Sequence, residues 1–153
     1  MTTNKTDRWF PDSMPPPMVD QESLPWWRGA AEHKLLVQQC SGCGHCRLPP
    51  SPLCGECQSF DSSWVEVNGK GTLFTYTVVH RAVAMEQELP FVIAIVELDM
   101  SGVERGNSVR VMTNIVEKLG AYLDPSELKI GASVEVVWEV MSGEVSIPRF
   151  QLA

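Results

Sequence analysis

Long apolar runs are missing from this sequence: no stretch reaches the roughly 18 consecutive apolar residues that a membrane-spanning helix needs. The segment from Met1 to Asp12 is polar and contains no apolar core of a signal peptide. Heptads and internal repeats are absent too, so neither a coiled coil nor a repeat protein is expected. These absences predict a globular cytoplasmic protein with no membrane partner.

Basic residues are scarce. The chain has 12 Lys and Arg residues against 19 Asp and Glu residues, a formal net charge of −7. Nucleic-acid binding depends largely on neutralising phosphates with Lys and Arg, so this balance argues against it. Phe74, Tyr76 and Phe91 offer rings for stacking on bases, but few basic residues accompany them. A nucleic-acid-binding module therefore stays only an alternative, and no nucleic-acid partner is expected.

Catalytic groups are few as well. The three histidines, His33, His45 and His80, stand in no recognisable triad or metal-ligand spacing. The glycine-rich stretch from Asn68 to Gly71 lacks the Gly-Lys-Ser/Thr ending of a phosphate-binding loop, and a strand pattern follows it instead of a helix. We therefore expect no catalytic residue, and no enzyme activity of this chain on its own.

What the sequence does have is a cysteine motif. Cys40, Cys43, Cys54 and Cys57 form two C-x2-C knuckles separated by ten residues. Four soft thiolates at this spacing suit a closed tetrahedral Zn²⁺ site, which stabilises a fold and leaves no coordination position for substrate. Iron in a rubredoxin-like site, disulfides and a redox switch remain alternatives.

Two neighbours of the knuckles leave alternatives open. Cys46 could replace a nearby cysteine as a ligand or act as a nucleophile, but an unused thiol beside the site is the favoured interpretation. His45 lies between Cys43 and Cys46 and fits a supporting or surface residue better than a ligand.

The N-terminal 25 residues are rich in proline, which fixes φ and removes backbone donors. This composition predicts an extended arm outside any core, either disordered or lying on a partner. A short helix from Trp26 to about Ala31 and a strand over Leu35–Gln39 follow. Trp26 and Trp27 either pack against the zinc module or form a partner interface.

After Cys57, short β-branched runs alternate with glycine and polar turns, which favours strands joined by tight connections. A short helical or turn segment is expected over Val116–Tyr122, and Gly69 and Gly71 are expected to bend or bulge the first long strand. This pattern predicts a mainly β protein with a C-terminal OB-type Greek-key barrel. The expected strands are Val65–Val67, Thr72–His80, Phe91–Asp99, Val109–Asn114, Ser133–Met141 and Ser146–Phe150. The expected divisions are 1–38 (arm and short helix), 39–62 (zinc ribbon) and 63–153 (OB-fold domain).

Several stretches together carry a family resemblance, in an order and spacing more specific than the ribbon alone. They are Trp26-Trp27-Arg28-Gly29, the cysteine ribbon with Pro49-Pro50, Val67–His80, Pro90–Asp99, Ile130–Val136 and Ile147–Phe150. From about Leu24 to Phe150 the chain resembles the DUF35 family, in which a rubredoxin-like zinc ribbon precedes an OB fold. Against the family pattern, Cys46 is extra, the arm is long and the loop Ser101–Asn107 is polar.

The resemblance implies an accessory subunit that accompanies a thiolase-like or aldolase enzyme, or a MaoC-like hydratase. The partner would hold the catalytic groups, and this chain would hold the assembly together and help shape the acyl-CoA site. A CoA thioester shared with the partner would need cations for its phosphates. The candidates are Arg28, Lys34, Arg47, Lys70 and Arg81. A stand-alone acyl-CoA-binding protein is a further alternative.

Overall fold

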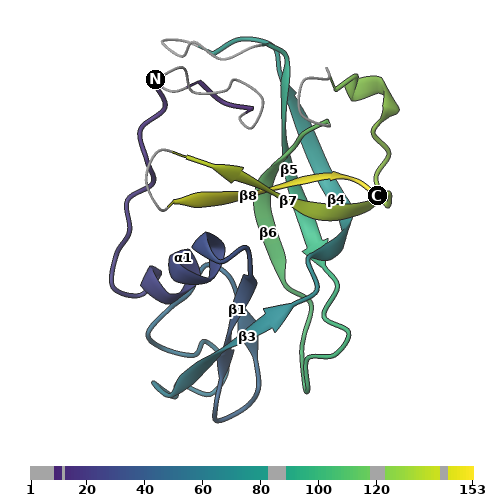
Figure 1. Ribbon diagram of the computed structural model, residues 1–153. Helices are drawn as coiled ribbons and strands as arrows, with labels where there is room; N and C mark the ends of the chain where they lie inside the picture. Colours follow the sequence, from purple (N-terminus) through teal and green to yellow (C-terminus); the bar gives the residue numbers. More distant parts are fainter. Residues whose placement is uncertain (1–8, 12, 83–88, 118–122, 142–144) are drawn as a thin grey trace.

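The structure is a computed structural model that describes residues 9–11, 13–82, 89–117, 123–141 and 145–153. It is mainly β, with a short helix, a ribbon of three strands and a barrel of five, as the sequence predicts (Figure 1). Most of the turn or helix expected over Val116–Tyr122 lies outside the described residues. Within the described part of the chain, no helix has the length and apolarity needed to cross a bilayer.

The helix and the ribbon sheet form the first part of the molecule. Helix α1 (Leu24–Ala31) has Pro25 in its first turn, where a missing N–H costs no intrahelical hydrogen bond. Strand β1 (Leu35–Cys40) pairs antiparallel with β2 (Cys46–Arg47) on one side and with β3 (Ser62–Val67) on the other. The ribbon sheet therefore extends from Leu35 to Val67, beyond both ends of the expected 39–62 range.

The second part is a closed barrel. Its strands are β4 (Lys70–Val79), β5 (Phe91–Leu98), β6 (Arg110–Ile115), β7 (Ser133–Val140) and β8 (Ser146–Leu152), and a 3₁₀ turn, η1 (Pro125–Glu127), precedes β7. The order around the barrel is β4-β5-β6-β8-β7, and β6 meets β8 in parallel. This is the strand order of an OB fold, so the fold prediction is confirmed.

The glycines before and within β4 agree with the expectation of a bend at Gly69, but not with that of a bulge. The register shift in β4 lies between Leu73 and Thr75, which places the bulge at Phe74. Gly69 instead turns the chain between β3 and β4 with φ of +74°, and a Cβ there would meet Val136. A Cβ on Gly71 would lie 2.6 Å from the Glu97 carbonyl oxygen. The glycines permit close approach of neighbouring strands, and the bulge forms further along β4, at Phe74.

The ribbon and the barrel share one hydrophobic core. Leu35 and Val37 of β1 belong to the same buried cluster as Leu73, Val96 and Phe150 of the barrel. Burial in β5 alternates strictly, so every second residue faces inward. The barrel thus buries apolar surface of the ribbon directly.

The N-terminal segment, purple in Figure 1, descends along one side of the molecule to α1. Most of residues 13–22 are exposed, as expected for a proline-rich arm. The expectation that the arm stays out of any core is wrong at its described beginning, because Phe10 is only 7% exposed and packs on the barrel. Burying the Phe10 ring removes a large apolar area from water, and hydrogen bonds from Trp9 and Phe10 add to this anchor.

Candidate metal centre and partner-facing residues

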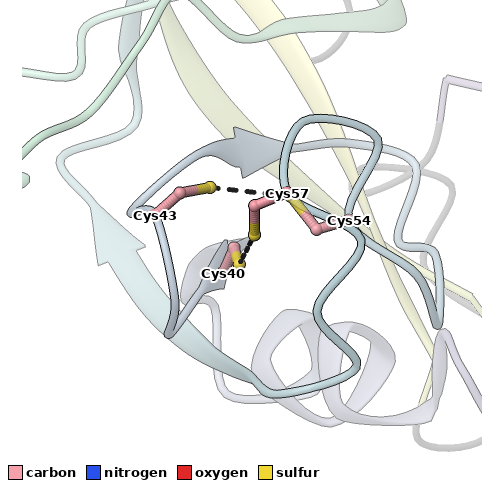
Figure 2. A group of neighbouring side chains, drawn as sticks. All are labelled: Cys40, Cys43, Cys54 and Cys57. Carbon is pink, nitrogen blue, oxygen red and sulfur yellow. Dashed lines mark hydrogen bonds between the residues drawn. The ribbon is translucent and has the colours of Figure 1, made fainter.

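The two cysteine knuckles converge on one point. Cys40 ends β1, Cys43 follows in the turn to β2, and Cys54 and Cys57 lie in the loop between β2 and β3. Figure 2 shows the four side chains pointing toward one another. The Sγ atoms of Cys40 and Cys57 are 3.5 Å apart and those of Cys43 and Cys54 are 3.7 Å apart. All four sulfurs lie within 4.8 Å of one another.

These distances fit a tetrahedral zinc site. With Zn–S bonds of about 2.3 Å, the sulfur atoms of such a site are separated by about 3.8 Å. The backbone N–H of Cys43, directed at the Cys40 sulfur, is the main cause that lowers the pKa of the Cys40 thiol to about 6. Because metal ligands bind as thiolates, this amide favours the binding form. Zinc held by these four residues would fix both knuckles and leave no open coordination position for chemistry.

A loop of the barrel holds the first knuckle in place, and the sequence analysis missed this contact. Asn107, between β5 and β6, accepts from the Cys46 backbone N–H at 2.6 Å and donates to the Cys46 carbonyl at 3.1 Å. The Gln39 amide donates to the carbonyls of Gly44 and Glu104. Asn107 belongs to the polar loop Ser101–Asn107, which departs from the family pattern. That departure was the feature of the sequence that could have indicated this contact.

Cys46 is not part of the cluster. It lies on β2, is 1% exposed and belongs to the hydrophobic core. Burial raises the pKa of its thiol, against a smaller opposing effect of the Gln39 side chain. A buried thiol with a raised pKa is a poor nucleophile, and here its surroundings resemble those of a structural cysteine. The unused-thiol interpretation agrees with this geometry.

The five candidate cations do not form one cluster. Lys70 begins the ten-residue strand β4 and Arg81 lies just beyond its other end, roughly 35 Å away for an extended chain. Lys34 pairs with Glu32 at 2.6 Å, and Arg28 is exposed in the last turn of α1. Lys70 lines an open cleft of about 530 Å³ together with Glu97, Asp99 and Glu135, an acidic surrounding that disfavours phosphate.

Arg47 differs from the other four. Its Nη2 donates to the Ser51 carbonyl at 2.7 Å, whereas its Nε and Nη1 are buried without a hydrogen-bond partner among the described residues. Buried donors without partners are uncommon in folded proteins and favour an additional ligand or solvent molecule.

The tryptophan pair is partly buried. The rings of Trp26 and Trp27 contact each other edge to face, with centroids 4.7 Å apart. Trp26 packs against the hydrophobic core, and its Nε1 is buried without a partner among the described residues. Both side chains keep some exposed surface, so packing and interface roles are compatible here.

The rings considered for base stacking are already engaged. The Arg110 guanidinium covers the Phe74 ring at 3.6 Å and pairs with Glu97. Tyr76 faces the core and donates to the Leu128 carbonyl, and Phe91 packs edge to face on Phe10. They therefore do not form the free, adjacent row of rings that single-stranded nucleic acids use.

A four-thiol ribbon joined to an OB barrel defines the class of zinc-ribbon OB-fold proteins. Residues 27–62 match the family model described as the ChsH2 rubredoxin-like zinc ribbon domain, and residues 64–139 match the ChsH2 C-terminal OB-fold domain. The chain is also 31% identical to a DUF35 domain-containing scaffold protein of Methanocaldococcus jannaschii, over 73% of each chain. This protein belongs to the DUF35 family, so the resemblance is confirmed.

Two further similarities bear on function. The solved structure titled "Ltp2-ChsH2(DUF35) aldolase" superposes with a TM-score of 0.76 at 31% identity, covering 90% of this chain and 98% of that chain. A probable enoyl-CoA hydratase alpha subunit of Thermomonospora curvata is 30% identical over 151 residues, which is 99% of this chain. The chain spans only 44% of that relative's length.

Proposed function

We propose that this chain is a non-catalytic accessory subunit of a thiolase-superfamily complex that acts on an acyl-CoA. It holds the assembly together through the ribbon and barrel and helps shape the acyl-CoA site. The observation that carries the proposal is the match, over nearly the whole of its length, to a DUF35 chain from an aldolase assembly. The scaffold description of the archaeal relative supports the same role.

The inventory of side chains supports a non-catalytic role. Four of the five thiols converge on one another, and the fifth is buried with a raised pKa. His33 stacks on Trp138 with centroids 5.4 Å apart, and His80 is exposed beyond the end of β4. Acyl transfer needs a nucleophile, a base and oxyanion donors together, and the described residues do not bring these groups together around any of these side chains.

The zinc bound by Cys40, Cys43, Cys54 and Cys57 is proposed to be structural. The supporting observations are the closed four-thiol set and the match to a zinc ribbon model. Metal binding at such a site stabilises a fold that is otherwise lost. The ribbon would thus present Trp26 and Trp27, packed beside it on α1, to the enzyme partner.

Direct contact with CoA is proposed for Arg47 ahead of the other four cations. Two of its buried guanidinium nitrogens have no partner among the described residues and are the donors proposed for a CoA phosphate oxygen. In the reconstituted complex, Arg47→Ala should raise KM for the CoA substrate about tenfold, whereas Arg81→Ala should not. Equal effects of the two variants would remove Arg47 from this role.

The experiment that tests the function is purification of the tagged chain from its native host under mild conditions, followed by native mass spectrometry and metal analysis. The expected result is a stoichiometric complex with a thiolase-superfamily enzyme, one zinc ion per copy of this chain, and turnover of an acyl-CoA that needs both chains. A chain that runs alone yet turns over an acyl-CoA would overturn the proposal.

A second candidate function is supported by the Thermomonospora relative: the same chain, or a longer protein containing it, serves a hydratase of the MaoC-like type. The same purification distinguishes the two, because the co-purifying enzyme would then hydrate an enoyl-CoA instead of forming or cleaving a carbon–carbon bond.

A further inference from the structure

The barrel has one narrow junction. Strand β5 pairs with β6 at six positions and β7 pairs with β8 at seven. Between β6 and β8, the strand register contains the single pair Ile115 and Phe150, extended by a bond from the Val116 N–H to the Phe150 carbonyl at 2.8 Å. Backbone hydrogen bonds alone therefore hold β6 and β8 together only weakly.

A chain of buried side chains spans this junction. Arg149 of β8 donates through Nη1 to the Asn114 Oδ1 of β6 at 2.6 Å, and through Nε and Nη2 to the Glu139 Oε2 of β7, each at 2.8 Å. Asn114 in turn donates to the Val92 carbonyl of β5. Four strands are thus joined by three side chains, two of them charged and more than nine-tenths buried.

The remaining oxygen of Glu139 binds the N-terminal segment. Its Oε1 accepts the backbone N–H groups of Trp9 at 3.1 Å and Phe10 at 2.9 Å. The Phe10 ring covers the Arg149 guanidinium at 4.2 Å and packs on Phe91. The Trp9 indole Nε1 donates to the Glu117 carbonyl, just beyond β6, at 2.8 Å.

The segment that connects Phe10 to α1 is, by contrast, mostly exposed. Met18 is 96% exposed and Val19 is 44% exposed. The hydrogen bonds around Asp20 and Ser23 are local to this segment. A proline-rich connection of this kind acts as a semi-rigid spacer between two anchored ends.

We propose that Glu139, Arg149, Asn114 and Phe91 form an intramolecular peptide-binding site, and that its ligand is the chain's own Trp9–Phe10, here called the N-terminal clip. The site recognises two consecutive backbone N–H groups and one aromatic ring. By filling it, the clip closes the junction between β6 and β8. This inference does not depend on the proposed function.

The test uses the full chain with a specific protease sequence inserted after Met18 and cleaved in the folded protein. The N-terminal fragment is expected to stay bound in native mass spectrometry. With Phe10→Ala, the fragment should dissociate about tenfold faster or more, because the ring and its cation–π contact are lost. Met18→Ala, in the same fragment but exposed, is the matched control and should leave dissociation unchanged.

A second measurement follows the junction itself. After the fragment leaves, amide hydrogen exchange should rise in 110–115 and 146–152 and stay unchanged in the ribbon strand Leu35–Cys40. An acetylated peptide of residues 9–18, added in excess, should restore the protection, and the same peptide with Phe10→Ala should not. Because the substitution is then carried by the peptide and not by the folded chain, this measurement still tests the site if Phe10→Ala destabilises the uncleaved protein.

Three results would overturn the proposal. The wild-type fragment could dissociate as fast as the Phe10→Ala fragment. Exchange in β6 and β8 could be unaffected by release of the fragment. Both peptides could also restore protection equally, which would mean that the aromatic ring is not recognised.

Discussion

The zinc ribbon and the N-terminal clip contact opposite ends of strands β5 and β6, and they do so by different chemistry. The ribbon end is held by four thiols drawn from the segment Cys40–Cys57 and by Asn107 of the β5–β6 loop. The clip end is held by the buried ion pair of Arg149 and Glu139. Glu139 also accepts the backbone N–H of Phe10, which is 129 residues away along the chain. A local metal motif and a long-range polar contact thus stabilise one barrel from its two ends.

The comparison shows how differently the two ends depend on their surroundings. Metal ligation at the ribbon is set mainly by short spacings between cysteines and is coupled to binding of the ion. At the clip, burial lowers the pKa of Arg149 while Glu139 raises it, and the guanidinium remains charged because arginine does not deprotonate in proteins. A buried charge pair is tolerated only when every partner is present. The ribbon should therefore respond to chelation, and the clip end to loss of any single partner.

Of the changes predicted here, metal removal should destabilise the protein most. Binding of structural zinc contributes about 10–16 kcal/mol in small zinc domains, so chelation or Cys43→Ser should unfold the ribbon. Hydrogen exchange should rise across residues 35–67, while β7 and β8 at the clip end keep their protection. Cys46→Ser, at a thiol outside the cluster, is the matched control and should retain the metal. Simultaneous unfolding of ribbon and clip end would show that the two ends are not separable.

Removing Glu139 should be the next largest change. Glu139→Ala leaves the Arg149 guanidinium buried without its carboxylate and removes the acceptor of two backbone N–H groups. The free energy of unfolding should fall by about 3–5 kcal/mol, measured by denaturant titration with the metal bound. Glu135→Ala on the same strand, where the Glu135 side chain accepts from the Gln151 amide, should cost about 1 kcal/mol. Equal losses would remove the special role of the buried pair.

Loss of Asn107 should weaken the ribbon end more gently than loss of metal. Asn107→Ala removes both hydrogen bonds to the Cys46 backbone, which should cost about 1–3 kcal/mol and speed transfer of zinc to a chelator. Glu104→Ala, in the same loop with an exposed side chain, is the control. If both variants release zinc at the wild-type rate, the loop does not support the metal site.

The smallest effect is expected at Cys46. Cys46→Ala removes one buried sulfur, so stability should fall by only about 1 kcal/mol and the zinc content should stay at one ion per chain. In the folded zinc protein, Cys46 should also resist iodoacetamide, because the reactive form is the thiolate and burial raises its pKa. Rapid alkylation of Cys46, or loss of metal from Cys46→Ala, would indicate that this thiol has a functional role.

The sequence was a good guide where structure depends on neighbours in the chain. The strand expected over Phe91–Asp99 is β5, Phe91–Leu98, because its inward residues alternate. A bend or bulge was expected at Gly69 and Gly71, but the bulge lies at Phe74, because its position is set by the pairing of β4 with β5. The burial of Phe10 was not predicted, because nothing near it in the sequence indicates that the Glu139 carboxylate will accept its backbone N–H.

By itself, the sequence determined the zinc ribbon, the barrel and the family. Two residues between the cysteines of each pair let both of their sulfurs bind one ion, and period-two patterns set which side of a strand is buried. Only the tertiary structure decided that Cys46 is buried apart from the other four thiols, that Asn107 connects the barrel loop to the ribbon, and that Phe10 covers Arg149. Each of these depends on groups that are distant in the chain, and their meeting is fixed by the closure of the barrel.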